Sequence, residues 1–309
     1  MKRERSDVSP GWSADARTQL LVALTFAVLG AAHGVARAQS PQASERKFED
    51  LDLRAFARPT QIDNEWLPLK PGTRFVYEGT TIEDDGTAVP HRVVITVTDL
   101  VKVIGGVPSV VSWDLDYSDG ELVEAELAFF AQDDAGNVWR MGEYPEEYED
   151  GKFVAAPTWI HGIEGARAGI EMRAKPQPGT PSYSQGWAPA VGFTDRGKVD
   201  QLGQQAKVPS GSYEDVLVIA EVSGAEKDAQ QLKHYARGVG NIRVGWKGAG
   251  EKTRETLELV KVEGLSPEAL ADVRAKALLL EKSAYARSKS VYGRTPPAER
   301  VPQAAGKGE

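Results

Sequence analysis

The sequence predicts a mainly β protein, built as an antiparallel sandwich or half-open barrel with one C-terminal amphipathic helix. Three observations predict it. Short apolar or alternating runs end at Asp-Gly and Gly-Gly turns, strand patterns do not alternate with helical ones, and a single helical period follows the last strand. Runs between such turns form hairpins, and the missing alternation excludes a doubly wound or βα-barrel architecture.

Two blocks of strands are expected within one β domain over residues 72–264, which an extended segment over 39–71 precedes. Valine, isoleucine and aromatic residues mark each strand, and glycine with aspartate marks each turn. The first block has strands at 72–82, 92–98, 108–118 and 121–132. The second block has strands at 199–205, 213–222, 230–236, 241–246 and 253–263.

Residues 143–197 separate the two blocks and show no clear period of a strand or a helix. They are rich in glycine, proline and aromatic residues. Within a compact domain, so long an irregular stretch is usually functional or covers a surface. We expect this insertion, or the C-terminal helix, to cover the concave face of the sheet.

The helix is expected over residues 265–292. Ser266 has the side chain of an N-cap, and Pro267 suits the first helical position. One apolar stripe follows at steps of three and four, formed by Leu270, Val273, Ala277, Leu280 and Ala284, while Arg274, Lys276, Lys282 and Arg287 are expected to face water. The tail over 293–309 lacks apolar residues to bury and is expected to be disordered.

Residues 1–38 have the pattern of a secretory signal peptide. A basic start precedes an apolar run at 20–29, and the stretch ends with Ala36-Arg37-Ala38. The apolar run is shorter than the roughly 20 residues that span a bilayer, and small residues at −3 and −1 suit cleavage after Ala38. We therefore expect a periplasmic or secreted protein with no integral membrane segment after cleavage.

Charge and cysteine content exclude several classes of function. The chain has 37 basic and 45 acidic residues and no cysteine. Loss of residues 1–38 removes five basic and three acidic residues, which leaves 32 and 42 and a net charge of −10. This balance argues against nucleic acid as a partner, because phosphate binding needs clustered Lys and Arg. Without cysteine there is no disulfide, thiolate metal site or cysteine nucleophile.

Acidic residues flank the predicted turn at Asp119-Gly120. A two-residue turn would place Asp114 and Asp116 on one face of the hairpin, and Glu124 and Glu126 on the other. A carboxylate among apolar neighbours has a raised pKa and can act as a general acid or base. One face of the hairpin could instead simply be exposed to solvent. A slip of one residue in the register of the two strands would reverse the two faces.

Candidate catalytic residues are acidic groups and one histidine. Only three histidines follow the signal peptide, and none has a second ligand at a metal-binding offset; His161 in the irregular insertion is the best single candidate. The acidic run 143–150 lacks EF-hand spacing, so a solvated loop is favoured over a calcium site. No metal site or cofactor is assigned. The catalytic candidates are His161, Asp114, Glu124, Asp133 and Glu143.

Aromatic residues of the insertion are candidates for ligand binding. Aromatic side chains that line a concavity suit sugars or flat apolar ligands. The same side chains could instead anchor the insertion to the sheet. The candidates are Trp159, Trp187, Tyr183 and Phe153.

Several motifs carry a resemblance to a known group of proteins. They are Phe56-x-x-Pro-Thr-x-Ile-Asp-Asn64, Pro68-Leu-x-Pro-Gly-Thr73, Tyr77-Glu-Gly79, Ala131-Gln-Asp-x-x-Gly-Asn-Val-Trp139 with Gly142-Glu143, Val208-Pro-x-Gly211 and Tyr235-Ala-x-Gly-Val-Gly240. Through these motifs the chain resembles a family of exported bacterial β-rich proteins of unassigned function. It also resembles, more loosely, exported proteins with lipoprotein-carrier-like half-barrels. That second likeness implies a concave sheet able to hold a lipid-like ligand.

The leading hypothesis is a non-catalytic exported protein that binds a small apolar or aromatic ligand on a concave sheet. It follows from the strand pattern, the aromatic insertion and the lack of a complete catalytic motif. The first alternative is an exported enzyme that uses carboxylate and histidine acid-base chemistry or a metal. The second is an envelope structural or assembly component.

Overall fold

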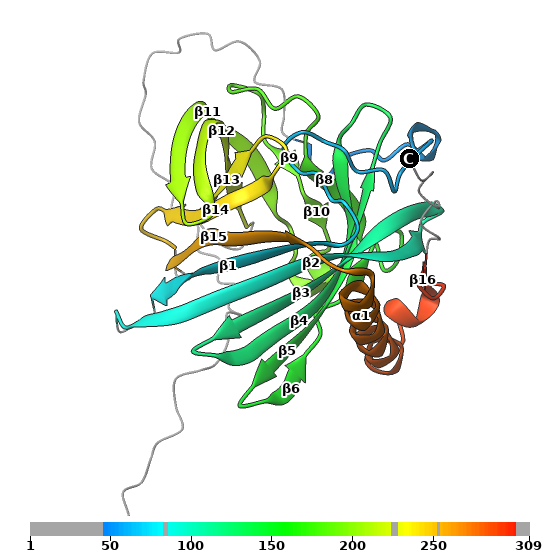
Figure 1. The fold of residues 1–309 in the computed structure, drawn as a ribbon. Coiled ribbons are helices and arrows are strands. Elements are labelled where there is room, and N and C mark those ends of the chain that lie inside the picture. Colours follow the sequence, from blue (N-terminus) through cyan, green and yellow to red (C-terminus); the bar gives the residue numbers. More distant parts are fainter. Residues whose placement is uncertain (1–45, 83–85, 224–227, 252–253, 301–309) are drawn as a thin grey trace, which may run out of the picture. The chain divides into compact units, whose positions relative to one another are not determined.

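The computed structural model describes residues 46–82, 86–223, 228–251 and 254–300 (Figure 1). The chain divides into two compact units, Met1–Gln42 and Ala43–Glu309, and every described residue belongs to the second. The expected signal peptide, 1–38, lies outside the described residues.

Strands dominate the described residues. Five long strands come first: β1 (Thr73–Ile82), β2 (Ala88–Ile104), β3 (Val107–Ser118), β4 (Glu121–Gln132) and β5 (Val138–Glu149). Five short ones follow: β6 (Lys152–Ala155), β7 (Trp159–Ile160), β8 (Arg167–Met172), β9 (Tyr183–Ser184) and β10 (Gly186–Trp187). The second block holds β11 (Arg196–Val208), β12 (Gly211–Val222), β13 (Gln230–Ala236), β14 (Gly240–Lys247) and β15 (Arg254–Gly264). Helix α1 (Pro267–Arg287) and the two-residue strand β16 (Glu299–Arg300) end the described chain, and three short 3-10 helices lie at Leu53–Ala55 (η1), Pro189–Val191 (η2) and Tyr292–Arg294 (η3).

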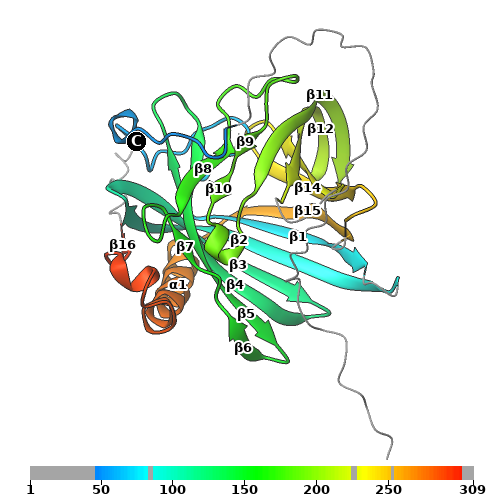
Figure 2. The same cartoon turned by 180° about the vertical axis from the view of Figure 1, so that it is seen from behind.

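The strands form one antiparallel sheet that nearly closes into a barrel. Its order is β10-β8-β5-β4-β3-β2-β1-β15-β14-β13-β12-β11-β9. The two ends of this order, β9 and β10, are consecutive in the chain, so residues 183–187, here called the strap, join the two edges. Ser184 pairs with Arg196 on β11, and Gly186 pairs with Ala168 on β8. Figures 1 and 2 show β2–β6 on one side and β11–β14 curled on the other.

The mainly β prediction, with a half-open barrel and one C-terminal helix, is confirmed. All nine expected strands are present, with bounds shifted by a few residues. The description of 143–197 as irregular is wrong. That stretch completes β5 and contributes β6 to β10. Its strands are two to six residues long, too short to show a period, and two of them close the barrel rather than cover it.

The motif residues 56–71, here called the plug, close one end of the barrel. The side chains of Ile62, Trp66 and Leu69 are buried in the inner core. The plug also bonds to turns on both sides of the barrel. Asn64 Nδ2 donates to the carbonyl oxygen of Gly136, which lies between β4 and β5, and the Gly238 amide between β13 and β14 donates to the Glu65 carbonyl. The recognised motifs therefore build a barrel end.

Two apolar clusters lie on the two faces of the sheet. The inner cluster fills the half of the barrel beside the plug, with Tyr77, Phe130 and Tyr235 among its buried side chains. The outer cluster lies between β2–β5 and α1, where Phe129, Leu280 and other side chains meet. Aromatic and branched side chains occupy the plug end of the interior, so they leave only the opposite end for a polar site.

Helix α1 begins as the sequence predicts. The Ser266 hydroxyl accepts from the Ala269 amide, Pro267 is in the first turn, and the predicted apolar stripe is buried. Arg274, which was expected to face water, instead forms an ion pair with Asp99 on β2. An acidic partner on the sheet explains why this basic residue turns inward. Arg287, which was also expected to face water, likewise pairs with Glu146 on β5 at 3.2 Å.

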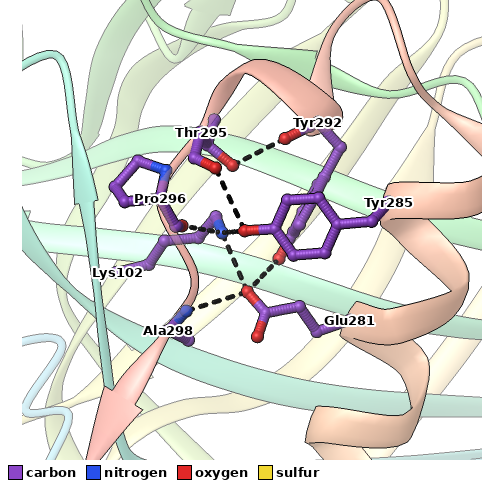
Figure 3. A network of polar contacts seen from close by, with 7 residues as sticks. All are labelled: Lys102, Glu281, Tyr285, Tyr292, Thr295, Pro296 and Ala298. Carbon is purple, nitrogen blue, oxygen red and sulfur yellow. Dashed lines mark hydrogen bonds and ion pairs between the residues drawn. The ribbon is translucent and has the colours of Figure 1, made fainter.

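The expected disorder of the tail is wrong for residues 293–300. β16 pairs with β2 at Leu100 and Val101, beside a buried polar network (Figure 3). The fully buried ammonium of Lys102 donates to Glu281 Oε1 at 2.8 Å, to the Tyr285 hydroxyl at 3.1 Å and to the Pro296 carbonyl at 2.6 Å. Backbone groups of the tail, together with the Ala298 side chain and the ion pair between Arg300 and Asp99, therefore hold it to the sheet. Residues 301–309 lie outside the described chain.

The Lys102–Glu281 pair should be essential for stability. Burial lowers the pKa of Lys102, and Glu281 opposes that shift. Breaking a buried pair leaves an uncompensated charge, so Lys102→Met should lower the free energy of unfolding by about 3 to 5 kcal/mol. Urea denaturation measures this.

Two further variants make that result specific. Lys102→Met combined with Glu281→Leu should recover most of the loss, because no charge remains buried. Lys282→Met, at an exposed position of α1, should match the wild type. A single Lys102→Met variant as stable as Lys282→Met would contradict the role of the network.

Candidate functional site

A β-bulge in β4 brings four carboxylates onto one face of the sheet. Asp116 lies opposite Glu124 and Asp114 opposite Glu126, whereas Tyr117 lies opposite Leu122, so Val123 is an extra residue. The predicted separation of the two pairs on opposite faces is therefore wrong. The turn residues alone indicate a register without the bulge, and one inserted residue shifts the pairing beyond it.

The four carboxylates point into the barrel, away from the plug. On β4 they continue the inner row of Ala128 and Phe130, which belong to the inner core. β5 adds Glu147 opposite Glu124, and Glu143 opposite Ala128. Like charges directly opposite on neighbouring strands repel, so these carboxylate rows destabilise the sheet that carries them.

An open pocket of about 410 Å³ lies against these rows and is here called the acidic pocket. Its apolar wall comes from Pro145, Pro157, Val191 and Phe193. Its charged lining consists of five carboxylates and one guanidinium, from Glu124, Glu126, Glu143, Glu147, Asp195 and Arg140. Negative groups therefore outnumber positive ones at this end of the barrel.

Arg140 on β5 is the cation of the pocket. Its guanidinium donates to Glu143 Oε2 at 2.6 Å and to Glu171 Oε2 at 3.0 Å, and lies 3.8 Å from Glu126 Oε1. Burial opposes the charge, but the carboxylates of Glu171, Glu143 and Glu126 outweigh it and raise the pKa of Arg140. Among the described residues, Glu124, Glu147 and Asp195 have no ion-pair partner.

Three carboxyls at this end of the barrel, those of Glu124, Asp114 and Asp195, have raised pKa values and hold protons at higher pH than usual. Burial, with the charges of Asp116 and Glu143, raises the pKa of Glu124 to about 8. Burial raises the pKa of Asp114 to about 7, against the hydrogen bond from Ser112. Asp195, buried near Glu221, has a pKa raised to about 6. In the free protein, protons therefore relieve part of the repulsion at neutral pH.

A second polar group joins the strap to the interior. Lys233 on β13 pairs with Glu221 on β12 at 2.7 Å. The side chain of Gln185 in the strap donates through Nε2 to Glu221 Oε1 at 2.6 Å. The backbone amide of Gln185 also donates to the backbone carbonyl of Asp195 at 2.8 Å. Because Asp195 lines the acidic pocket, the strap lies beside that pocket.

His91 on β2 lies beside the carboxylate rows. Its Nε2 is 2.6 Å from Asp116 Oδ1, and its Nδ1 is 3.0 Å from Glu255 Oε1 and 3.1 Å from the Thr81 hydroxyl. Burial works against the charge, but the hydrogen bonds to Asp116 and Glu255 raise the pKa of His91 to about 10. Both ring nitrogens are engaged, so His91, as a charged group, links its own strand β2 to β1, β3 and β15.

The structure brings together three of the five catalytic candidates. Glu124 and Glu143 line the acidic pocket, and Asp114 lies on the same inner face. Asp133 lies near the plug, where its carboxylate accepts from Asn137 and from Trp139 Nε1. His161 lies away from the pocket, and its Nδ1 accepts from the Ala168 amide.

The four aromatic candidates do not converge on one hollow. Trp159 stacks on Phe193 and lines a separate hollow of about 300 Å³. Tyr183 is fully buried in the strap. Trp187 lies under the ammonium of Lys47, and Phe153 lies under the guanidinium of Arg287.

Sequence reasoning missed several residues of the site. Arg140 stands among apolar residues of β5, and Glu171 is the single acidic residue of β8. Asp195 and Phe193 lie between the short helix η2 and the long strand β11. A charged residue inside an apolar run was the available signal for Arg140 and Glu171. Phe193 is one of the aromatic residues of the insertion, whereas Asp195 has no local signal, and closure of the barrel places both of them at the pocket.

The acidic run 143–150 divides between the two faces of β5. Glu143 and Glu147 face the pocket, whereas Glu146 accepts from the hydroxyls of Tyr144 and Tyr148. Within the described ranges, no group of three or more His, Asp or Glu side chains has the geometry to hold a metal ion.

Comparisons with known proteins give two distant structural likenesses. No family model matches the sequence, and no curated protein matches it. One solved structure, provisionally described as an exported protein with a YmcC-like fold from Bacteroides fragilis, aligns with 12% identity and a TM-score of 0.38, over 65% of this chain and 99% of its own. Another, provisionally described as a lipoprotein from Parabacteroides distasonis, aligns with 13% identity and a TM-score of 0.30, over 65% of this chain and 100% of its own.

None of the helices in the described part of the chain combines the length and the apolar character that crossing a bilayer requires.

Glu124 should destabilise the fold as the pH rises. Its pKa is about 8 in the folded state against an ordinary 4.5, so between these values the unfolded chain loses the proton and the folded chain keeps it. The stability of the wild type should therefore fall across this window. Glu124→Gln should exceed the wild type by about 2 kcal/mol above pH 8, and by little at pH 4.5. Urea denaturation at several pH values measures this.

Glu121→Gln, at an exposed position of the same strand, is the matched control and should change stability little at any pH. If the gain in unfolding free energy of Glu124→Gln over the wild type does not grow with pH, the raised pKa of Glu124 among neighbouring carboxylates is contradicted.

His91 should stabilise the fold at low pH. Its folded-state pKa is raised, so its contribution is fully present below about pH 6.5 and is lost as the pH rises toward 10. The gap in unfolding free energy between the wild type and His91→Gln should therefore shrink over that range. His161→Gln is the control, because burial lowers the pKa of His161. A gap for His91→Gln that is constant with pH would contradict this assignment.

Proposed function

We propose that the chain is an exported, non-catalytic binding protein whose acidic pocket takes a small organic cation. The observation that carries the proposal is the set of carboxylate rows. Asp116, Glu124 and Glu147 lie directly opposite one another across three strands, at the edge of a pocket with one guanidinium. Such crowding costs stability, and a bound cation would relieve it.

The lining of the pocket supports an organic cation over a purely apolar ligand. Its charged groups suit a cationic end, while Pro145, Val191 and Phe193 offer surface for a small hydrocarbon body. A volume of about 410 Å³ is within the range of small-molecule sites. The ligand class inferred from sequence, apolar or aromatic, is thereby changed to a cation with an apolar part.

Export is supported by the N-terminal pattern. The basic start, the short apolar run and the Ala36-Arg37-Ala38 end are those of a cleaved signal peptide. An exported protein meets the pH of its surroundings directly, and carboxyls with pKa values of about 7 and 8 would respond to it.

One observation favours a second function, an acid-base enzyme. Asp114 and Glu124 have pKa values of about 7 and 8, so either could hold and give up a proton near neutral pH. Arg140 could orient a negatively charged part of a substrate beside them. A ligand that the protein converts, rather than binds unchanged, would favour the enzyme over the binding protein.

Binding of n-butylammonium tests the proposal. Isothermal titration calorimetry at pH 8 and low salt should give saturable binding with one site. Glu124→Gln and Glu147→Gln should each weaken the affinity by about tenfold, which is the effect of losing one favourable charge contact of about 1.4 kcal/mol. Butan-1-ol, which shares the hydrocarbon chain without the charge, should not bind measurably.

The control variant is Glu121→Gln, which removes the same charge from an exposed position of β4. It should bind n-butylammonium as the wild type does. Equal weakening by Glu121→Gln and Glu124→Gln would mean that only the overall negative charge attracts the ligand, and the proposed site would be withdrawn.

A further inference from the structure

Two buried oxygen atoms lack a hydrogen-bond donor among the described residues, one in the lining of the acidic pocket and one in the strap, whose backbone bonds to the pocket residue Asp195. They are Glu126 Oε1 and Gln185 Oε1. Gln185 is only 3% exposed, and its side chain points inward, because its Nε2 donates to Glu221 inside the barrel. That hydrogen bond also fixes which end of the amide is the oxygen. A buried acceptor without a donor costs stability. In the free protein a proton offsets part of that cost at Glu126, because burial and the charge of Glu143 raise its pKa, whereas the amide oxygen of Gln185 still lacks a donor.

The cation already present shows the kind of group that this wall accepts. The guanidinium of Arg140 makes hydrogen bonds of 2.6 and 3.0 Å to the carboxylates of Glu143 and Glu171. These are the distances of charge-assisted N–H···O bonds. The pocket therefore binds its own cation through N–H groups.

The aromatic content of the pocket points the same way. Quaternary ammonium groups have no N–H and are held by cages of several aromatic rings. Phe193 is the one aromatic side chain among the residues that line the acidic pocket. A trimethylated cation would find one ring, and it would leave the acceptors without donors.

We infer that the ligand's cationic group is a primary ammonium on an aliphatic body, recognised through N–H bonds to the carboxylates of Glu124 and Glu126 and to the amide oxygen of Gln185. The inference rests on the proposed function, since it names the class of cation for the same pocket. Two ligands of equal charge should therefore differ in affinity according to the number of N–H donors that each one carries. A primary ammonium has three N–H donors, whereas its trimethylated analogue has none.

A pair of probes of equal charge tests the inference. Calorimetric titration of the full chain at pH 8 compares n-butylammonium with butyltrimethylammonium. The primary ammonium should bind at least about tenfold more tightly, because charge-assisted hydrogen bonds distinguish the two. Dissociation constants within about threefold of each other would overturn the inference and leave the proposed function in place. Failure of both probes to bind would refute the proposed function itself.

A variant in the strap adds a second readout. Gln185→Met keeps the length of the side chain and removes its acceptor, together with the Nε2 donor that bonds Glu221. It should reduce the preference for n-butylammonium by weakening that ligand a few fold, with butyltrimethylammonium unchanged. An unchanged preference in a folded Gln185→Met protein would exclude Gln185 from recognition. If the variant does not fold, the comparison of the two probes on the wild type still decides the inference.

Discussion

Repulsion between carboxylates on neighbouring strands is the constraint on which the site depends. The extra residue Val123 in β4 turns Glu124 and Glu126 to the face that already carries Asp114 and Asp116. Without that bulge, apolar Ala125 and Val123 would face the interior and the two glutamates would face outward. One inserted residue therefore sets the charge of the barrel interior, and it places Glu124 where burial and the charges of Asp116 and Glu143 raise its pKa.

The rest of the fold holds this unfavourable arrangement in place. The plug fills one end of the barrel with Trp66 and its apolar neighbours, so the strands cannot collapse to expel the charges. The strap joins β8 to β11 through a few backbone pairs, and Gln185 extends from it to Glu221. On the outer face, the Lys102 network fixes α1 and the tail against β2. The stability that the plug, the strap and the Lys102 network provide allows the fold to tolerate the repulsion between the carboxylates.

Much of the fold could be predicted from the sequence, because its signals are local. Turn dipeptides separate the strands, and Ser266 with Pro267 marks the start of α1. The short strands after β5 could not be predicted, since two-residue strands such as β9 have no period and exist only through their partners. The ordered conformation of residues 293–300 could not be predicted either, because the buried ammonium of Lys102 binds the backbone carbonyl of Pro296.

The site was predictable only in part, for the same physical reason. Asp114, Glu124 and Glu143 stood out as carboxylates among apolar residues, whereas the bulge that unites them depends on pairing that no turn residue encodes. His161 attracted attention through its place in the glycine-rich insertion, yet His91, in an ordinary strand, contacts two carboxylates. Barrel closure, which is non-local, brings Asp195 and Phe193 to the pocket.

Carboxyl ¹³C NMR of glutamate-labelled protein tests the central claim most directly. The Glu124 resonance, assigned by its loss in Glu124→Gln, should titrate with a midpoint near pH 8 in the free protein. Saturation with n-butylammonium should move that midpoint to lower pH, because a bound cation favours the carboxylate. A Glu124 midpoint near the ordinary value of 4.5, with or without the amine, would contradict the account.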